Sequence, residues 1–258
     1  MIEIINGLSF ELNDNNFTAK IIECCNSEGD IFIPRSIQLK ENDYIITTIS
    51  KCSFKNNKNI RSIKFSDESG LLLIEKKAFF RSTINSIYLP KSIQKLEEGW
   101  CNSTPKLTTI IISSENRQFL FYSLKFLLGK TNKNSEEFDL LLFARRDIEQ
   151  EKIPSFVKQI DKYAFCECKF VKSIEFEENS KHQKIKKSAF SKSSIQKVHL
   201  PSEMKEIEEG WCKKANKITM ITISPNNSNF LYYDDQFLLG KLNQKTANFD
   251  VLLFHVVI

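Results

Sequence analysis

Residues 97–101 read Glu-Glu-Gly-Trp-Cys, and the same five residues return at 208–212. The repetition extends to both sides, because residues 74–143 align with residues 185–254 at a constant offset of 111 positions, without insertion or deletion. Self-similarity at a fixed period is typical of a repeat architecture, in which stacked units share one continuous core. Such a scaffold presents a long surface rather than a single enclosed catalytic site.

A shorter period lies inside the long one. It is visible in the pairs of a small residue and an aromatic residue, which follow one another at intervals of 25 and 21 residues in each half: Ser53–Phe54, Ala78–Phe79, Gly99–Trp100, Ala164–Phe165, Ala189–Phe190 and Gly210–Trp211. The alternation at Ile87-x-Leu89-Pro90 predicts a very short strand that the proline ends. The spacing Ile-x-x-x-Ala-Phe favours a helical or 3-10 turn. Each coil is too short to bury its own apolar face, so the coils must stack.

The pattern is similar to the BspA-type leucine-rich repeat, which occurs in surface antigens of bacteria and parasitic protists. Ile153–Pro154, Val157, Ile160, Ala164–Phe165 and Cys168 fit this repeat, and the resemblance covers roughly residues 30 to 254. The resemblance implies a right-handed β/α superhelix used for adhesion and protein binding. Short parallel strands would form its concave face and short helical or 3-10 turns its outer face, with hairpin-like insertions between coils.

This reading divides the chain into four parts of one continuous solenoid. Residues 1–32 would form an N-terminal segment, residues 33–143 and 144–254 two leucine-rich-repeat super-units, and residues 255–258 the C-terminal end. A solenoid needs a polar cap on its terminal coil, and Phe254 to Ile258 are almost entirely apolar. We therefore expect that this end is either truncated or covered by a partner.

Composition excludes several classes of protein. The chain is 41% hydrophobic with 7 glycines and 6 prolines, which suits a packed core rather than a disordered chain. Its 37 basic and 32 acidic residues are interspersed, so no basic stripe predicts nucleic-acid binding. No 18-residue apolar run predicts a membrane span, and the N-terminus lacks the pattern of a signal peptide. The resemblance implies a cell-surface or secreted protein, and the missing export signal favours a cytoplasmic one.

Motifs of enzymes and metal sites fail on inspection. Cys166-x-Cys168 lacks the spacing of a zinc site, and the seven cysteines are odd in number, which favours buried free thiols. Gly129–Lys130–Thr131 resembles the end of a phosphate-binding loop, but Leu124 stands where that loop requires its first glycine. The pairs Glu97–Glu98 and Glu208–Glu209 are typical of charges at a helix start. We predict no catalytic residues, no metal, no cofactor and no enzymatic activity.

Partner binding is predicted on the strand positions that lie between buried ones, since solenoids use the concave surface. The twelve candidate contact residues are Arg61, Lys64, Asn85, Tyr88, Thr109, Ile111, Lys172, Glu175, Gln196, His199, Met220 and Thr222. The same strands add Ser62, Ser86, Thr108, Ser173, Lys197 and Thr219. Tyr88 and His199 occupy the same register and are the first candidates for mutation. The insertions at 116–138 and 227–249 are a second candidate surface, although their repeated apolar runs favour a paired hairpin that packs on the solenoid.

Two functions remain open at this stage. The first is a non-catalytic adhesion or recognition protein that displays its concave face to a host or cell-surface protein. The second is an intracellular scaffold that binds a cytosolic protein through the same face, favoured by the missing export signal and the odd number of cysteines.

Overall fold

The computed structural model describes residues 1–177, 179–241 and 248–255, and within these ranges the secondary structure consists of strands and turns. The chain divides into two compact units, Met1–Leu124 (unit 1) and Lys125–Ile258 (unit 2). Each unit is a β-solenoid with parallel strands, so the predicted repeat solenoid is confirmed.

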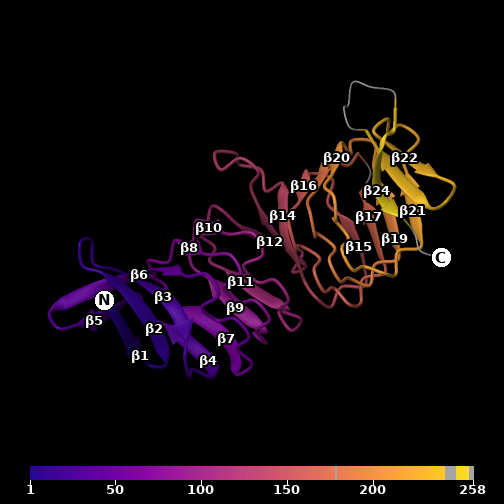
Figure 1. The fold of residues 1–258 in the computed structure, drawn as a ribbon. Coiled ribbons are helices and arrows are strands. Elements are labelled where there is room, and N and C mark those ends of the chain that lie inside the picture. Colours follow the sequence, from indigo (N-terminus) through magenta and orange to yellow (C-terminus); the bar gives the residue numbers. More distant parts are fainter. Residues whose placement is uncertain (178, 242–247, 256–258) are drawn as a thin grey trace. The chain divides into compact units, whose positions relative to one another are not determined.

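Unit 1 carries two ladders of parallel strands on opposite sides of its coils, as Figure 1 shows. One ladder runs β4-β7-β9-β11, and the other continues from the N-terminal hairpin as β3-β6-β8-β10. The strands are β1 (Ile2–Ile5), β2 (Leu8–Asn13), β3 (Thr18–Cys24), β4 (Gly29–Ile33), β5 (Ser36–Leu39), β6 (Asn42–Ile49), β7 (Ile60–Phe65), β8 (Leu73–Ile74), β9 (Ser86–Leu89), β10 (Lys95–Leu96), β11 (Thr109–Ile112) and β12 (Leu120–Tyr122).

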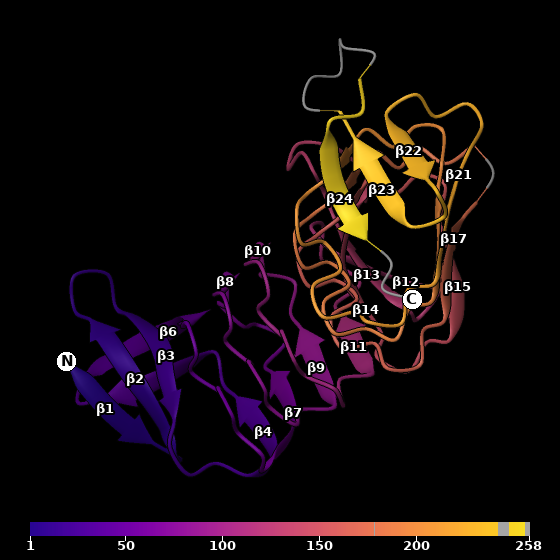
Figure 2. The same ribbon diagram turned by 45° about the vertical axis from the view of Figure 1, so that its right-hand side comes forward.

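Unit 2 repeats this plan. One ladder runs β15-β17-β19-β21, and the other runs β14-β16-β18-β20 after the hairpin β13–β14. Figure 2 shows β22, β23 and β24 as a separate three-stranded sheet in this unit. The strands are β13 (Phe126–Gly129), β14 (Leu140–Ala144), β15 (Gln150–Ile153), β16 (Gln159–Ile160), β17 (Ser173–Phe176), β18 (Lys184–Ile185), β19 (Lys197–Leu200), β20 (Glu206–Ile207), β21 (Met220–Ile223), β22 (Phe230–Tyr233), β23 (Phe237–Gly240) and β24 (Val251–His255).

The strands that precede proline end as predicted. β9 ends at Leu89 before Pro90, and β19 ends at Leu200 before Pro201. Proline has no N–H to donate to a ladder, so it limits these strands to four residues.

The predicted helical turns on the outer side are wrong for the described residues. Ala78 N donates to Glu75 O, which closes a single turn, but Lys77 within it has a left-handed φ of 59°. Ser188 at the matching position of unit 2 has a φ of 61°. A left-handed residue interrupts right-handed helical backbone, so each coil makes one tight turn instead of a helix.

The structure also corrects the alignment of the tryptophan coils. Leu96 pairs with Ile74 in the parallel ladder β8–β10, and Trp100 N donates to Glu97 O as Ala78 N donates to Glu75 O. Trp100 therefore occupies the position of Ala78, and Gly99, with a φ of 65°, takes the left-handed position before it. Glycine is the residue that adopts this conformation at no steric cost.

The shifted register explains why a cysteine follows each tryptophan. Cys101 takes the place that Phe79 holds one coil earlier, and both Trp100 and Cys101 are buried. The same exchange occurs in unit 2, where Trp211–Cys212 replaces Ala189–Phe190. The order of side-chain sizes is reversed, from small then large in Ala78–Phe79 to large then small in Trp100–Cys101. Substitutions that conserve the total volume of a core are tolerated best.

Stacked rings form the centre of both cores. In unit 1 the Phe54 and Phe79 rings stack with their centroids 5.0 Å apart, and Trp100 meets Phe79 edge-on at 6.0 Å. In unit 2 the Phe165 and Phe190 rings stack at 4.7 Å, and Trp211 meets Phe190 edge-on at 5.7 Å. Aromatic pairs in these arrangements add stability beyond the area they bury.

One core position differs in kind between the units. Leu71 in unit 1 corresponds to His182 in unit 2, and both side chains are fully buried. The His182 ring stacks on Phe176 at 4.7 Å, its Nδ1 lies 3.3 Å from the Val157 carbonyl oxygen, and its Nε2 has no hydrogen-bond partner. Burial lowers the pKa of His182 to about 3, so its imidazole is neutral in the folded protein at neutral pH.

A buried asparagine closes each long repeat. Asn116 Nδ2 donates to the carbonyl oxygens of Pro90 and Ile93, and its Oδ1 accepts from the N–H groups of Gln118 and Phe119. Asn227 donates to Pro201 O at 2.7 Å and accepts from Asn229 N at 2.8 Å. One side chain thus satisfies the backbone of the preceding coil and of its own turn.

The hairpins β13–β14 and β23–β24, which share the sequence Phe-Leu-Leu-Gly in their first strands, have different surroundings. In unit 2, β14 pairs in parallel with β16, and Leu141 is fully buried. Its counterpart Leu252 on β24 is 57% exposed, and β24 pairs only with β23 among the described strands. Residues 256–258 of the predicted C-terminal end, and 242–247 of the second insertion, lie outside the described residues.

Candidate functional site

The ladder β4-β7-β9-β11 of unit 1 carries two rows of residues on its outer face. Phe32 on β4 pairs with Lys64 on β7, and Tyr88 on β9 pairs with Ile111 on β11. Because Ile63 pairs with Ile87, Lys64 and Tyr88 are level with each other. These four residues form row B, and the smaller residues Asp30, Ser62, Ser86 and Thr109 form row A two positions earlier on the same strands.

The ladder β15-β17-β19-β21 of unit 2 has the same two rows. Row A contains Gln150, Ser173, Lys197 and Met220, which are consecutive partners across the ladder. Row B contains Lys152, Glu175, His199 and Thr222. A cavity of about 360 Å³ opens on this face and is lined by members of both rows.

The twelve predicted contact residues fall on these two faces, six in each unit. Arg61, Lys64, Asn85, Tyr88, Thr109 and Ile111 lie on β7, β9 and β11 or directly before them. Lys172, Glu175, Gln196, His199, Met220 and Thr222 occupy the matching places of unit 2, and all six line its cavity. Within each unit the ladder therefore brings the predicted residues together.

Sequence reasoning missed the outward residue on the first strand of each face. Phe32 on β4 is 63% exposed in row B of unit 1, and Lys152 takes the same place on β15 of unit 2. The signal was present in the sequence: Ile31-x-Ile33-Pro34 has the spacing of Ile87-x-Leu89-Pro90. Applying the strand-before-proline pattern there would have placed Phe32 on the outer face.

Tyr88 and His199 have different roles despite their common register. His199 Nδ1 lies 3.0 Å from Thr222 Oγ1 across the ladder, so the imidazole is held along the row. Tyr88 is half-buried and stands between Lys64 and Ile111 in row B of unit 1. The two faces thus centre on a polar and an aromatic side chain.

The carboxylate pairs have a structural role, but the predicted helix starts are wrong. Glu97 Oε2 accepts a hydrogen bond of 2.9 Å from Lys76 N in the preceding coil, and Glu208 Oε2 accepts one of 2.9 Å from Lys187 N. The hydrogen bond from Lys76 N lowers the pKa of Glu97. Burial raises the pKa of Glu208, but the hydrogen bonds from Lys187 and Lys184 outweigh it and the net shift is downward. These side chains join consecutive coils.

The loop that resembles a phosphate-binding loop is a hairpin turn. Thr131 donates to Asp139 from both its N–H and its hydroxyl, at 2.8 and 2.9 Å, and Asp139 also pairs with Lys158 at 3.2 Å. The Lys130 ammonium lies over the Phe138 ring at 5.1 Å from its centroid, and Lys241 lies over Phe249 in the same way at 5.0 Å. The lysine and the hydroxyl are therefore committed to the turn.

The cysteines and histidines of the described residues form no cluster that could hold a metal ion. Cys101, Cys166, Cys168 and Cys212 are buried, and all seven cysteines are free thiols. Burial raises the pKa of the Cys212 thiol to about 12, so this thiol stays protonated. None of the described residues forms a helix long and apolar enough to cross a membrane.

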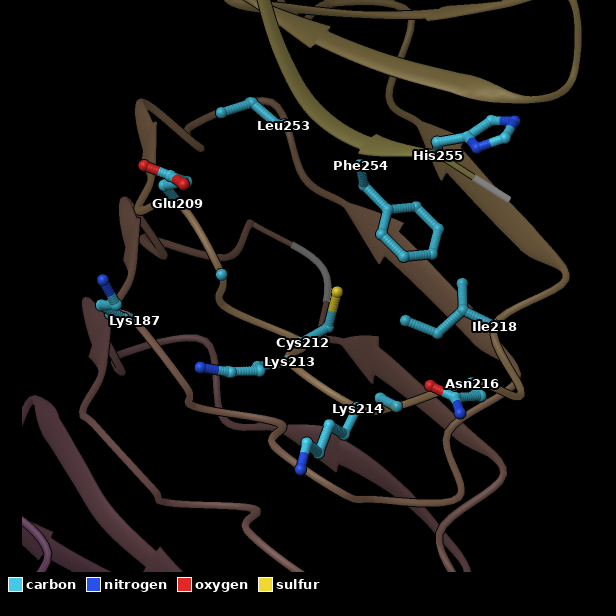
Figure 3. A pocket seen from close by; sticks show the side chains of 12 residues that line it. Lys187, Glu209, Cys212, Lys213, Lys214, Asn216, Ile218, Leu253, Phe254 and His255 are labelled. Carbon is cyan, nitrogen blue, oxygen red and sulfur yellow. The ribbon is translucent and has the colours of Figure 1, made fainter. Parts of the chain in front are cut away.

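A second cavity, of about 770 Å³, lies between β24 and the coil of Trp211. Figure 3 shows the Phe254 ring beside Cys212 and Ile218 in this cavity, while Lys187, Lys213 and Lys214 lie at its edge. Phe254 also meets the Trp211 ring edge-on at 6.0 Å. Cys212 and Ile218 belong to the buried core of this coil, whereas Leu253 and Phe254 come from β24.

Comparison with known proteins identifies the repeat. A family model described as a BspA type leucine rich repeat region matches residues 16–127 and 137–244, with six copies. No curated protein sequence matches the chain.

Three solved structures similar to the chain are bacterial leucine-rich repeat proteins. A leucine-rich repeat protein from Eubacterium ventriosum superposes with a TM-score of 0.54 at 13% identity, covering 88% of this chain and 73% of its own. A leucine-rich cell surface protein from Faecalibacterium prausnitzii has a TM-score of 0.38 at 14% identity, and the match covers 87% of this chain and 95% of that protein. A leucine-rich repeat protein from T. pallidum has a TM-score of 0.31 at 13% identity, and the match covers 85% of this chain and 70% of that protein.

Proposed function

Because the chain belongs to the BspA-type leucine-rich repeat family, we propose that it is a non-catalytic protein-binding module that contacts its partner through the strand faces of units 1 and 2. The observation that supports this is the pair of four-stranded parallel ladders, whose outward rows carry exposed side chains such as Lys64 and Glu175. Rigid, solvent-facing strand positions on a solenoid are the surface that such proteins use for recognition.

We further propose that the partner is a host or cell-surface protein and that the module serves adhesion. The resemblance to surface antigens supports this. The alternative is an intracellular scaffold, and the seven free thiols favour it, since exported proteins usually oxidise their cysteines. Protease and antibody accessibility on intact cells decides between them: exposure of the native protein supports adhesion, and protection until the membrane is opened contradicts it.

The use of the strand faces is tested by photo-crosslinking. A photoreactive phenylalanine analogue is placed at Tyr88, at His199 and, as a control, at Lys95 on the opposite ladder of unit 1. We expect one partner protein to be crosslinked from Tyr88 or His199 and not from Lys95. An excess of the purified chain without the analogue should reduce this crosslinking by competition. Equal labelling from all three positions would contradict binding through these faces.

A further inference from the structure

Row B of unit 1 is apolar at three of its four positions. Phe32 is 63% exposed, Ile111 is 49% exposed, and the half-buried Tyr88 stands between Lys64 and Ile111 in the row. Single exposed apolar side chains are ordinary on protein surfaces, but here three lie in one row across four neighbouring strands, interrupted by Lys64 alone. Adjacent strands lie about 4.8 Å apart, so the row extends about 14 Å across the sheet.

Lys64 is the one charged member of this row, and its ammonium has no ion-pair partner among the described residues. The nearby acid is already committed: Asp30 pairs with Arg61 at 3.4 Å and accepts a hydrogen bond of 2.7 Å from the Ser62 hydroxyl. An unpaired cation between Phe32 and Tyr88 favours a carboxylate from a partner, because apolar neighbours reduce the water that screens the pair.

The side chains of row A are shorter than those of row B, so the surface is lower along row A. Ser62, Ser86 and Thr109 are small, and Ser62 is buried beneath its neighbours. An extended chain that crosses the strands can therefore lie over row A, with its side chains against the taller Phe32, Tyr88 and Ile111. Aromatic side chains at the centre of an interface carry much of its binding energy.

We propose that row B of unit 1, made of Phe32, Lys64, Tyr88 and Ile111, binds an extended acidic and apolar segment of a partner protein, with a carboxylate on Lys64 and apolar side chains on either side of it. This inference rests on the proposed function and assigns its main contact surface to unit 1. Row B of unit 2 is the internal contrast: Lys152, Glu175, His199 and Thr222 carry both signs of charge and no large apolar side chain.

The test is selection of a random twelve-residue displayed peptide library on the full chain. We expect the enriched peptides to combine Asp or Glu with Phe, Leu, Ile or Trp. Their affinity should fall at least tenfold for the double variant Phe32→Ser and Ile111→Thr. Lys64→Glu should shift the enrichment from acidic to basic peptides. Each substituted side chain is solvent-facing, so these variants should keep the fold, which circular dichroism checks.

The double variant Lys197→Glu and Met220→Thr on the face of unit 2 is the comparison, and it should lower the affinity of these peptides far less than the unit 1 double variant does. The control is Lys95→Gln on the opposite ladder of unit 1, which should leave peptide affinity unchanged. Peptides whose affinity falls with the unit 2 variant and not with the unit 1 variants would overturn this inference and leave binding through the strand faces intact. Enriched peptides that are insensitive to both sets of variants would contradict the inference and the proposed function together.

Discussion

Units 1 and 2 have nearly the same core and different strand faces. The inward residues Ile63 and Ile87 return 111 positions later as Ile174 and Val198. The outward residues change in character at the same offset: Lys64 becomes Glu175, Tyr88 becomes His199, and Ile111 becomes Thr222. Coil stacking thus fixes the inward positions and leaves the outward ones free to diverge, which is how one scaffold can carry two recognition surfaces.

The largest expected effect is loss of a stacked ring. Phe54→Ala in unit 1 and Phe165→Ala in unit 2 should each lower the free energy of unfolding by about 3–5 kcal/mol, because each leaves a cavity in a closed core. The loss should be greater at Phe165, whose ring also meets Phe126 at 6.3 Å. Hydrogen exchange by mass spectrometry in denaturant measures each unit separately. A loss below about 1 kcal/mol at either position would contradict the close packing of that ring in its core.

The next effect concerns the asparagines that close the long repeats. Asn116→Ala and Asn227→Ala should each cost about 2–3 kcal/mol, because buried carbonyl and N–H groups of two segments lose their partners. Asn116 makes more of these hydrogen bonds, so its substitution should cost more. The exposed Asn134→Ala serves as the control, with no expected change. Urea denaturation of each variant provides the measurement.

A pH-dependent difference should follow from His182 and Leu71. The folded pKa of His182, about 3, lies below its ordinary value of 6.5, so the unfolded chain binds more protons between these values. The stability of unit 2 should therefore fall as pH decreases from about 6.5, by about 2 kcal/mol at pH 5, while unit 1 has no such contribution from Leu71.

The matched variant is His182→Leu, which gives unit 2 the residue of unit 1. Unfolding free energies of both proteins between pH 5 and 7 provide the measurement. If the variant retains the same decrease in stability over this range, His182 is not its cause.

The smallest effect concerns the carboxylates that join consecutive coils. Glu97→Gln and Glu208→Gln should each cost about 1 kcal/mol or less, because the amide still accepts from the backbone N–H and the site is partly exposed to solvent. Glu209→Gln, at an exposed neighbouring position, is the control. Thermal unfolding of the three variants compares them, and equal shifts for all three would show that the inter-coil hydrogen bonds contribute nothing specific.

The sequence predicts the architecture well because the inward positions follow a strict period. The spacing of Ile63, Ile87 and Ile110 is enough to place β7, β9 and β11 and the outward residues between them. The tryptophan coils were misaligned because Trp100 and Cys101 exchange large and small volumes between adjacent positions, and letter matching cannot detect an exchange of volume. Phe32 was missed because its strand stands before the first clear repeat. Burial of His182 could not be expected, because a histidine does not mark a core position.

The three hairpins β2–β3, β13–β14 and β23–β24 also bear on how such a gene can change in length. β3 pairs in parallel with β6 as β14 pairs with β16, so the same junction introduces the first coil of each unit. Recombination between two equivalent points of the coding sequence adds or removes 111 codons. The junction that it creates between coils is the same as one that the chain already contains. Descendants of this gene can therefore lengthen in steps of one long repeat of 111 residues, and each added face is then free to acquire its own specificity.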